Sequence, residues 1–73
     1  MPVHELDLHG VLHSDVDRIV ENFLYLNQHH MPLTIICGNS LRMITLAKGT
    51  INRIGCDVYE SRFGIINVIA FNK

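Results

Sequence analysis

Near the end of the chain the sequence reads Ile65-Ile66-Asn67-Val68-Ile69-Ala70-Phe71, and this stretch decides the fold. Every residue in it except Asn67 is apolar, and the β-branched and aromatic types that favour strands predominate. A strand wetted on one face alternates apolar and polar residues, whereas a well-buried strand reads as a nearly continuous apolar run. We therefore predict a strand over 65–71 that lies inside a sheet rather than at its edge.

The segments just before this strand read as a helix and a second strand. Residues 57–62 are predicted to be a strand, joined to the last one by a turn at Phe63-Gly64. Residues 41–54 carry apolar side chains at helical spacing, and Gly55 suits a helix stop. The apolar stripe of this helix comprises Leu41, Ile44, Ala47, Ile51 and Ile54.

The first half of the chain repeats the pattern of strand followed by helix. Residues 3–9 alternate apolar and polar side chains, as a half-buried strand does. Residues 14–29 are predicted to form an amphipathic helix with Ser14 as its N-cap. The apolar run 33–37, closed by Gly38-Asn39, is a third strand. The order is therefore βαβαββ, which predicts a two-layer α/β fold with right-handed crossovers.

Length and charge limit what the chain does. Its 73 residues are enough for one domain, which we place over 1–73. Six lysines and arginines stand against seven aspartates and glutamates, so the formal net charge is −1 at pH 7. Any contact with nucleic acid then requires a local basic patch. Hydrophobic residues make up 48% of the chain, and apolar surface left over from the core indicates self-association as a homodimer.

The two cysteines and the absence of long apolar segments predict a cytoplasmic protein. Cys37 falls at a strand end and Cys56 at a strand start, so we expect them to lie too far apart for a disulfide. Free thiols suit a reducing compartment. No stretch has the length of a membrane span, and the first residues lack the pattern of a signal peptide. We expect a soluble protein without a membrane partner.

Chemically useful residues gather where the predicted parallel strands end, the edge at which α/β sheets bind ligands. Asp7 and His9 are two residues apart, hence on one face of the first strand. The turn from Cys37 to Ser40 leads into a helix N-terminus, and Arg42 lies in its first turn. These parts suit the gripping or cleavage of a phosphodiester. On residues alone, however, such an Asp and His pair is more often simply an exposed polar pair.

The stretch Leu6-Asp7-Leu8-His9-Gly10, an amphipathic helix, and the turn Ile35-Ile36-Cys37-Gly38 leading to Leu41-Arg42 together resemble the Smr domain, the small MutS-related module. The resemblance spans almost the whole chain. It implies a four-stranded mixed sheet of order 1-2-4-3 with both helices on one face. This is the fold of the C-terminal domain of bacterial initiation factor three.

The resemblance also implies binding of RNA or DNA and, as in several Smr domains, endonucleolytic cleavage. Asp7 and His9 match the catalytic candidates of the family motif. The residues expected to contact nucleic acid share the same rim and are Gly10, His13, Gly38, Asn39, Ser40 and Arg42. No cofactor is implied. A divalent metal stays an open alternative that the spacing does not support, because Asp7, His9 and His13 lack a recognised metal-ligand spacing.

The chain departs from the Smr pattern in its second motif. Cys37 stands where the family has His or Thr, and Ser40 stands at its final Gly. The alternatives are therefore a module that binds nucleic acid without cutting it, and a module that self-associates through the sheet. Tyr59 is a further candidate for stacking on a base or for a subunit contact. Four basic residues read as scattered solvated surface: Arg18, Lys48, Arg53 and Arg62.

Overall fold

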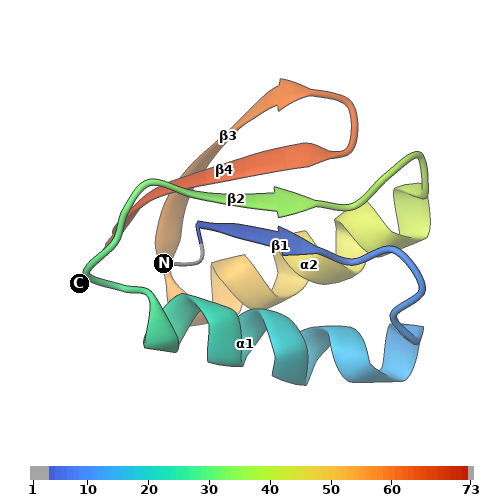
Figure 1. Ribbon diagram of the computed structural model, residues 1–73, viewed down its shortest axis with the longest axis horizontal. Helices are drawn as coiled ribbons and strands as arrows, with labels where there is room; N and C mark the ends of the chain where they lie inside the picture. Colours follow the sequence, from blue (N-terminus) through green and yellow to red (C-terminus); the bar gives the residue numbers. More distant parts are fainter. Residues whose placement is uncertain (1–3, 73) are drawn as a thin grey trace.

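Four strands form one mixed sheet in the computed structural model, which describes residues 4–72 (Figure 1). The elements in chain order are β1 (Glu5–Asp7), the short 3-10 helix η1 (His13–Asp15), α1 (Val16–Leu26), β2 (Leu33–Ile36), α2 (Leu41–Ile54), β3 (Cys56–Arg62) and β4 (Ile65–Phe71). The sheet order is β1-β2-β4-β3, with both helices against one face. The α/β class and the predicted strand order are confirmed.

Strand β4 lies between β2 and β3, as its apolar sequence predicts. It pairs antiparallel with both neighbours, and its residues Ile66 and Val68 are fully buried beneath the helices. Strand β1 pairs parallel with β2. Strands β1, β2 and β3 therefore all point the same way. Their carboxyl ends meet the β3–β4 turn at one edge of the molecule, on the right in Figure 1.

We call this edge the carboxyl rim. It comprises residues 7–13 after β1, residues 37–42 at the start of α2, and residues 62–64 at the β3–β4 turn. Each segment follows or joins a strand whose position is fixed by the sheet, so segments distant in sequence are brought together. The candidate functional residues all lie on this rim.

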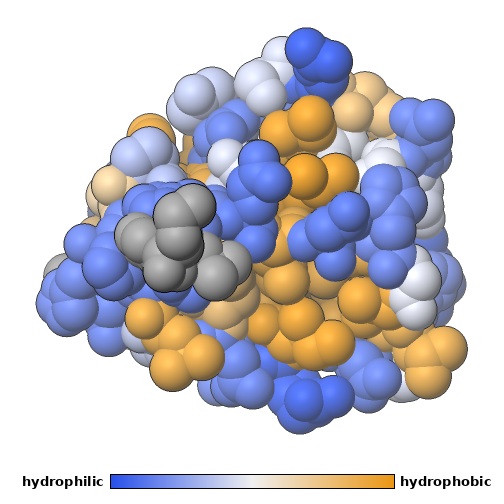
Figure 2. All heavy atoms as spheres, viewed as in Figure 1, coloured by the Kyte–Doolittle hydropathy of each residue, from blue (hydrophilic) through white to orange (hydrophobic). Residues whose placement is uncertain are grey.

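One apolar core fills the space between the sheet and the two helices. Each element gives one face to it because apolar residues recur at helical spacing in α1 and α2 and alternate in the strands. The largest fully buried apolar side chains are Leu8, Val16, Val20, Leu24, Leu33, Ile35, Ile51, Ile66 and Val68. Figure 2 shows further apolar side chains in the middle of the face that carries β1 and α1. Self-association through such a surface stays a prediction.

The start and the end of the first helix were predicted wrongly. Ser14 is not its N-cap: it lies inside η1, and the cap position of α1 is Asp15, which makes no side-chain capping bond. The backbone N–H of Asp15 instead donates to the Leu12 carbonyl at 2.9 Å, which builds the preceding turn. The helix ends at Leu26 rather than residue 29, because Asn27 donates from its side chain to the Phe23 carbonyl at 2.9 Å.

The other boundaries differ little from prediction. Strand β1 spans only Glu5–Asp7, and residue 3 lies outside the described residues. Backbone hydrogen bonds to β2 continue on either side of it, from the Thr34 N–H to the His4 carbonyl and from the Leu8 N–H to the Ile36 carbonyl. The predicted range of α2 is confirmed, and Gly55 ends it at a positive φ of 91°. Strand β2 ends at Ile36, one residue earlier than predicted, and β3 begins one residue earlier, at Cys56. Cys37 and Cys56 are both buried free thiols, and no helix within residues 4–72 is long and apolar enough to cross a membrane.

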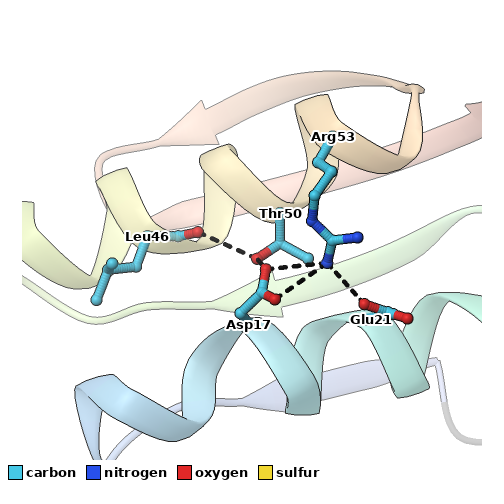
Figure 3. Close-up of polar contacts among 5 residues, drawn as sticks. All are labelled: Asp17, Glu21, Leu46, Thr50 and Arg53. Atoms are coloured by element: carbon cyan, nitrogen blue, oxygen red, sulfur yellow. Dashed lines mark hydrogen bonds and ion pairs between the residues drawn. The ribbon is translucent and has the colours of Figure 1, made fainter.

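A polar network joins the two helices (Figure 3). Thr50 of α2 donates its hydroxyl to Asp17 of α1 at 2.6 Å. Arg53 donates to both oxygens of Asp17, at 3.0 and 3.1 Å, and to Glu21 at 2.6 Å. The hydrogen bond from Thr50, followed by that from Arg53, lowers the pKa of Asp17 below its usual value of 3.8. The network ties α1 to α2, and the charges of Asp17, Glu21 and Arg53 are paired within it.

We expect acid to weaken this network. Because the pKa of Asp17 is lower in the folded state, its contribution is present above about 3.8 and is lost as the pH falls through the folded-state pKa. Asp17→Asn should lower the free energy of unfolding at neutral pH and flatten its decline between about pH 5 and pH 2. Urea denaturation at several pH values measures both effects.

The matched control is Asp57→Asn. Asp57 is exposed on β3 and makes no side-chain hydrogen bond or ion pair with any residue of the described chain. An Asp17→Asn protein whose stability and acid profile match those of Asp57→Asn would show that the network contributes nothing.

Candidate functional site

Asp7 and His9 form a hydrogen-bonded pair at the carboxyl end of β1. One carboxylate oxygen, Oδ1 of Asp7, accepts the backbone N–H of His9 at 2.9 Å and lies 2.6 Å from its ring Nδ1. The two-residue spacing produces both contacts, because it puts the two side chains on the same side of the strand end. The side chains are 59% and 66% exposed, so the pair lies open to solvent.

The charge of Asp7 fixes the orientation and tautomer of the His9 ring. Hydrogen bonds from the His9 backbone and then from its side chain lower the pKa of Asp7. The carboxylate is therefore ionised at neutral pH and acts only as an acceptor, which requires the hydrogen of a neutral ring to be on Nδ1. The lone pair then lies on Nε2, directed away from Asp7, where the ring can accept a proton.

Gly38 lies directly against this Nε2. A Cβ at Gly38 would come 2.7 Å from the His9 Nε2, a distance that real Cβ atoms do not tolerate. Gly38 also has a positive φ of 71°, which side chains disfavour. The turn after β2 therefore needs glycine both for its own path and to leave room for the imidazole. Of the predicted site residues, Asp7, His9 and Gly38 are the ones that the structure brings into direct contact.

A second glycine, Gly64, holds the β3–β4 turn against the same point. A Cβ at Gly64 would overlap the carbonyl oxygen of Gly38, and its φ is 86°. The Gly64 carbonyl accepts the N–H of Cys37 at 2.7 Å. The sequence predicts a turn at Phe63-Gly64 but not this contact. A glycine in such a turn indicates a positive φ. It does not indicate that the turn packs against Gly38.

The N-terminus of α2 follows the Gly38 turn and lies on the same rim. Ser40 caps the helix, because its Oγ accepts the N–H of Met43 at 3.1 Å, and its carbonyl accepts the N–H of Ile44 at 3.0 Å. The first backbone N–H groups of the helix, those of Leu41 and Arg42, are the ones that a helix leaves without a carbonyl partner. They concentrate partial positive charge on the rim. Ser40, predicted as a contact to nucleic acid, thus has a capping role in the fold.

The remaining predicted residues lie on the rim but do not touch the Asp7–His9 pair through any hydrogen bond within residues 4–72. Asn39 and His13 are exposed, the latter at the start of η1. Gly10 has a φ of 77°, and a Cβ there would meet no atom within 4 Å, so it serves the path of the turn. Arg42 is exposed in the first turn of α2.

Unpaired positive charge is concentrated on the rim. Three basic residues are neutralised elsewhere: Arg18 by Asp15 at 3.5 Å, Lys48 by Glu60 at 2.5 Å, and Arg53 by Asp17 and Glu21. Within residues 4–72, Arg42 and Arg62 form no ion pair.

Arg62 is exposed, as predicted for it, but the sheet register also places it at the rim. Arg62 ends β3 and pairs with Ile65, which pairs with Ile36, which pairs with Asp7. Residues that pair directly point to the same face, so Arg62 and Asp7 lie in one row across the rim edge of the sheet. The sequence could have indicated this position, because Arg62 ends a predicted strand and the carboxyl ends of parallel strands meet at one edge of the sheet.

Cys37 belongs to the rim segment 37–42, but its side chain is buried in the core beneath it. It is almost completely buried in the core, and burial raises the pKa of its thiol. The thiol therefore stays protonated and unreactive at neutral pH. Among residues 4–72 no group of three or more His, Cys, Asp or Glu side chains is arranged to hold a metal ion.

Comparisons of the chain with protein-family models, with curated proteins and with solved structures gave no match. The class that fold and site define is accordingly a two-layer α/β domain with an Asp–His pair, a capped helix N-terminus and two unpaired arginines on one rim.

We expect Gly38→Ala to displace the His9 ring. The added methyl would collide with Nε2, and the positive φ would cost about 1–2 kcal/mol of stability in addition. Gly10→Ala is the matched control, because it carries the same backbone penalty without a neighbouring atom. The NMR resonances of the His9 imidazole should shift strongly in the first variant and little in the second. Equal shifts in the two variants would contradict the contact between Gly38 and His9.

Proposed function

We propose that this chain is a nucleic-acid-binding domain of the Smr type and that it cleaves phosphodiester bonds with Asp7 and His9. The observation that carries the proposal is the 2.6 Å contact between Asp7 Oδ1 and His9 Nδ1, with Nε2 held beside the turn that leads into the N-terminus of α2. A proton acceptor and an anion site thus lie on the same rim. The motif residues Leu6–Gly10 and the strand order add the resemblance to Smr domains.

The positively charged groups of the rim bind the nucleic acid. The first-turn amides of α2 and the guanidinium of Arg42 are suited to the oxygens of a backbone phosphate. Because Asp7 and His9 are mostly exposed, the site fits a polymer that crosses an open edge better than a small molecule that needs enclosure. A net charge of −1 means that this local patch, and not a general field, provides the attraction.

Cleavage follows from the tautomer of His9. Its Nε2 accepts the proton of the attacking hydroxyl, either a water or the 2′-hydroxyl of RNA, while Asp7 stabilises the imidazolium that forms. The attacking oxygen forms a new bond to phosphorus, and the bond from phosphorus to the leaving oxygen breaks. The leaving oxygen takes up a proton from solvent, and His9 returns its proton to solvent for the next cycle.

A domain that binds nucleic acid without cutting it is the second candidate, and Cys37 favours it. The Smr pattern has His or Thr at this position, but the Cys37 side chain is buried in the core and adds no group to the rim. The half of the site that orients the phosphate then consists mainly of backbone amides and Arg42. Loss of orientation reduces cleavage more than binding, because only the transition state requires an accurate geometry.

The cleavage proposal predicts that His9→Ala abolishes activity. Removal of a general base costs about 10²- to 10⁴-fold in rate. Asp7→Asn should also lower the rate, because it removes the charge that holds Nδ1 protonated. The measurement is cleavage of end-labelled RNA and DNA oligonucleotides on gels, with and without a divalent metal.

The matched control is His29→Ala, which removes an exposed imidazole from the segment after α1. Undiminished cleavage by both site variants would refute the catalytic roles of Asp7 and His9. If neither the unaltered protein nor any variant cleaves the substrate, the cleavage proposal fails and the domain that only binds nucleic acid is favoured.

The binding proposal predicts that Arg42→Ala weakens affinity for every sequence. Loss of one phosphate contact should reduce the slope of log K against log salt by about 1. Arg18→Ala is the control, since it also removes an exposed arginine, but one paired with Asp15 on the side of α1. Fluorescence anisotropy with a labelled oligonucleotide at several salt concentrations gives both slopes. Identical slopes for the two variants would exclude Arg42 from the contact.

A further inference from the structure

Phe63 is an exposed aromatic ring on the rim. Its side chain is 60% exposed, although phenylalanine in a small domain is ordinarily drawn into the core. It occupies the β3–β4 turn between Arg62 and Gly64. The other two rim segments also expose large apolar side chains, Leu12 after β1 and Leu41 at the start of α2. The open rim is therefore apolar as well as positively charged.

The turn that carries Phe63 is held firmly against the site. The Gly64 carbonyl accepts the Cys37 N–H at 2.7 Å, and Gly64 packs directly on the Gly38 carbonyl. Gly38 in turn lies against Nε2 of His9. Phe63 is thus one residue away from a chain of direct contacts that ends at the proposed general base. A ligand group resting on its ring would be placed relative to that base by the fold itself.

The neighbour of Phe63 supplies the matching charge. Arg62 forms no ion pair within residues 4–72, whereas Arg18, Lys48 and Arg53 are all neutralised. An aromatic ring and a guanidinium on consecutive residues supply the two groups with which proteins hold a base and its phosphate. Leu12 and Leu41 add apolar surface but have no aromatic face.

We propose that Phe63 is a stacking platform for an unpaired nucleobase and that Arg62 binds the adjoining phosphate, so that the domain takes single-stranded nucleic acid. This rests on the proposed function and names its substrate class. Bases within a duplex are stacked on both faces, and only an unpaired, unstacked base has a face to offer. Every base has such a face, so the platform selects strandedness and not sequence.

Tyr59 is the competing aromatic residue and serves as the control. It is also exposed, but it pairs with Asn67 in the row of the sheet that includes Thr34 and Glu5, two rows away from the row of Asp7 and Arg62. Its position is not tied to Gly38 or His9 by any hydrogen bond among the described residues. Tyr59→Leu therefore removes an equally exposed ring from outside the proposed site.

The first experiment compares affinities by fluorescence anisotropy at low salt. The probes are a labelled mixed-sequence RNA, the DNA of the same sequence, and the duplex of each. The unaltered protein should bind both single strands more tightly than the duplexes. Phe63→Leu should weaken single-strand binding by about 5- to 100-fold, the range for loss of one stacked base, and leave duplex binding unchanged. Tyr59→Leu should alter neither.

The second experiment observes stacking directly. The chain contains no tryptophan, so Phe63→Trp introduces a single reporter at the platform. Its fluorescence should be quenched, to saturation, by a single-stranded oligonucleotide. An oligonucleotide with the same phosphates but an abasic centre should quench it less at equal occupancy. Because Trp also stacks, this variant should retain the affinity that Phe63→Leu loses.

The outcomes separate this inference from the proposed function. If the unaltered protein binds none of the four probes, the proposed function fails and the inference with it. If it binds them but Phe63→Leu binds single strands equally well, or if duplex is preferred, the stacking platform is overturned while nucleic-acid binding stands. Equal loss of RNA and DNA affinity in Phe63→Leu supports the platform, since stacking does not require a 2′-hydroxyl.

Discussion

Gly38 and Gly64 allow two turns and an imidazole ring to lie closer together than any side chain would permit. The carbonyl of Gly38 occupies the space where a Cβ of Gly64 would be, and Nε2 of His9 occupies the space next to Gly38. The hydrogen bond from Cys37 to the Gly64 carbonyl holds the two turns in this position. Strands β1, β2 and β3 are therefore joined at their carboxyl ends by backbone contacts as well as by the sheet. The position of the His9 ring against the β2–α2 turn depends on this packing.

The distribution of charge matters more for the proposed function than its sum. The formal net charge of −1 argues against a protein that attracts nucleic acid over its whole surface. Yet the acidic residues Asp15, Asp17, Glu21 and Glu60 are all engaged with basic partners. What is left on the rim is Arg42, Arg62 and the N-terminus of α2, opposed by the hydrogen-bonded carboxylate of Asp7. Such a patch suits the proposed binding only as a short contact with few phosphates, for which the expected affinity falls with salt.

The sequence was sufficient for features that depend on local patterns. The apolar run 65–71 predicted an inner strand, and Ser40 and Gly55 mark the ends of α2 through capping chemistry that acts within a few residues. The pairing of Asp7 with His9 likewise follows from a two-residue spacing. Local reasoning failed at Ser14, because a backbone hydrogen bond formed the turn that a side-chain cap was expected to form.

Other features depend on contacts between segments that are distant in the sequence, and no local pattern predicts them. The approach of Gly64 to Gly38 joins residues 26 positions apart, and the pairing of Arg53 with Asp17 joins residues 36 positions apart. Arg53 and Arg62 look alike in the sequence, but one ties two helices together and the other ends a strand at the rim. Which arginine is free for a ligand is thus a property of the folded chain. The sequence predicted the strand order through its resemblance to a family, but it did not predict the distribution of charge.

The two halves of the rim differ in how they are built, and this bears on what the domain does. The half formed by β1 contributes side chains with reactive groups, Asp7 and His9, in a fixed mutual orientation. The half formed by the β2–α2 turn contributes mainly backbone, since Cys37 is turned into the core and the Ser40 oxygen is committed to capping. Backbone amides bind any phosphate that reaches them, whereas accurate placement of one phosphorus atom opposite Nε2 requires further contacts. The β3–β4 turn is the remaining segment within reach of that point, because Gly64 joins it to Gly38. Under the proposed function, cleavage in addition to binding requires that a ligand held at Arg62 and Phe63 be aligned with His9.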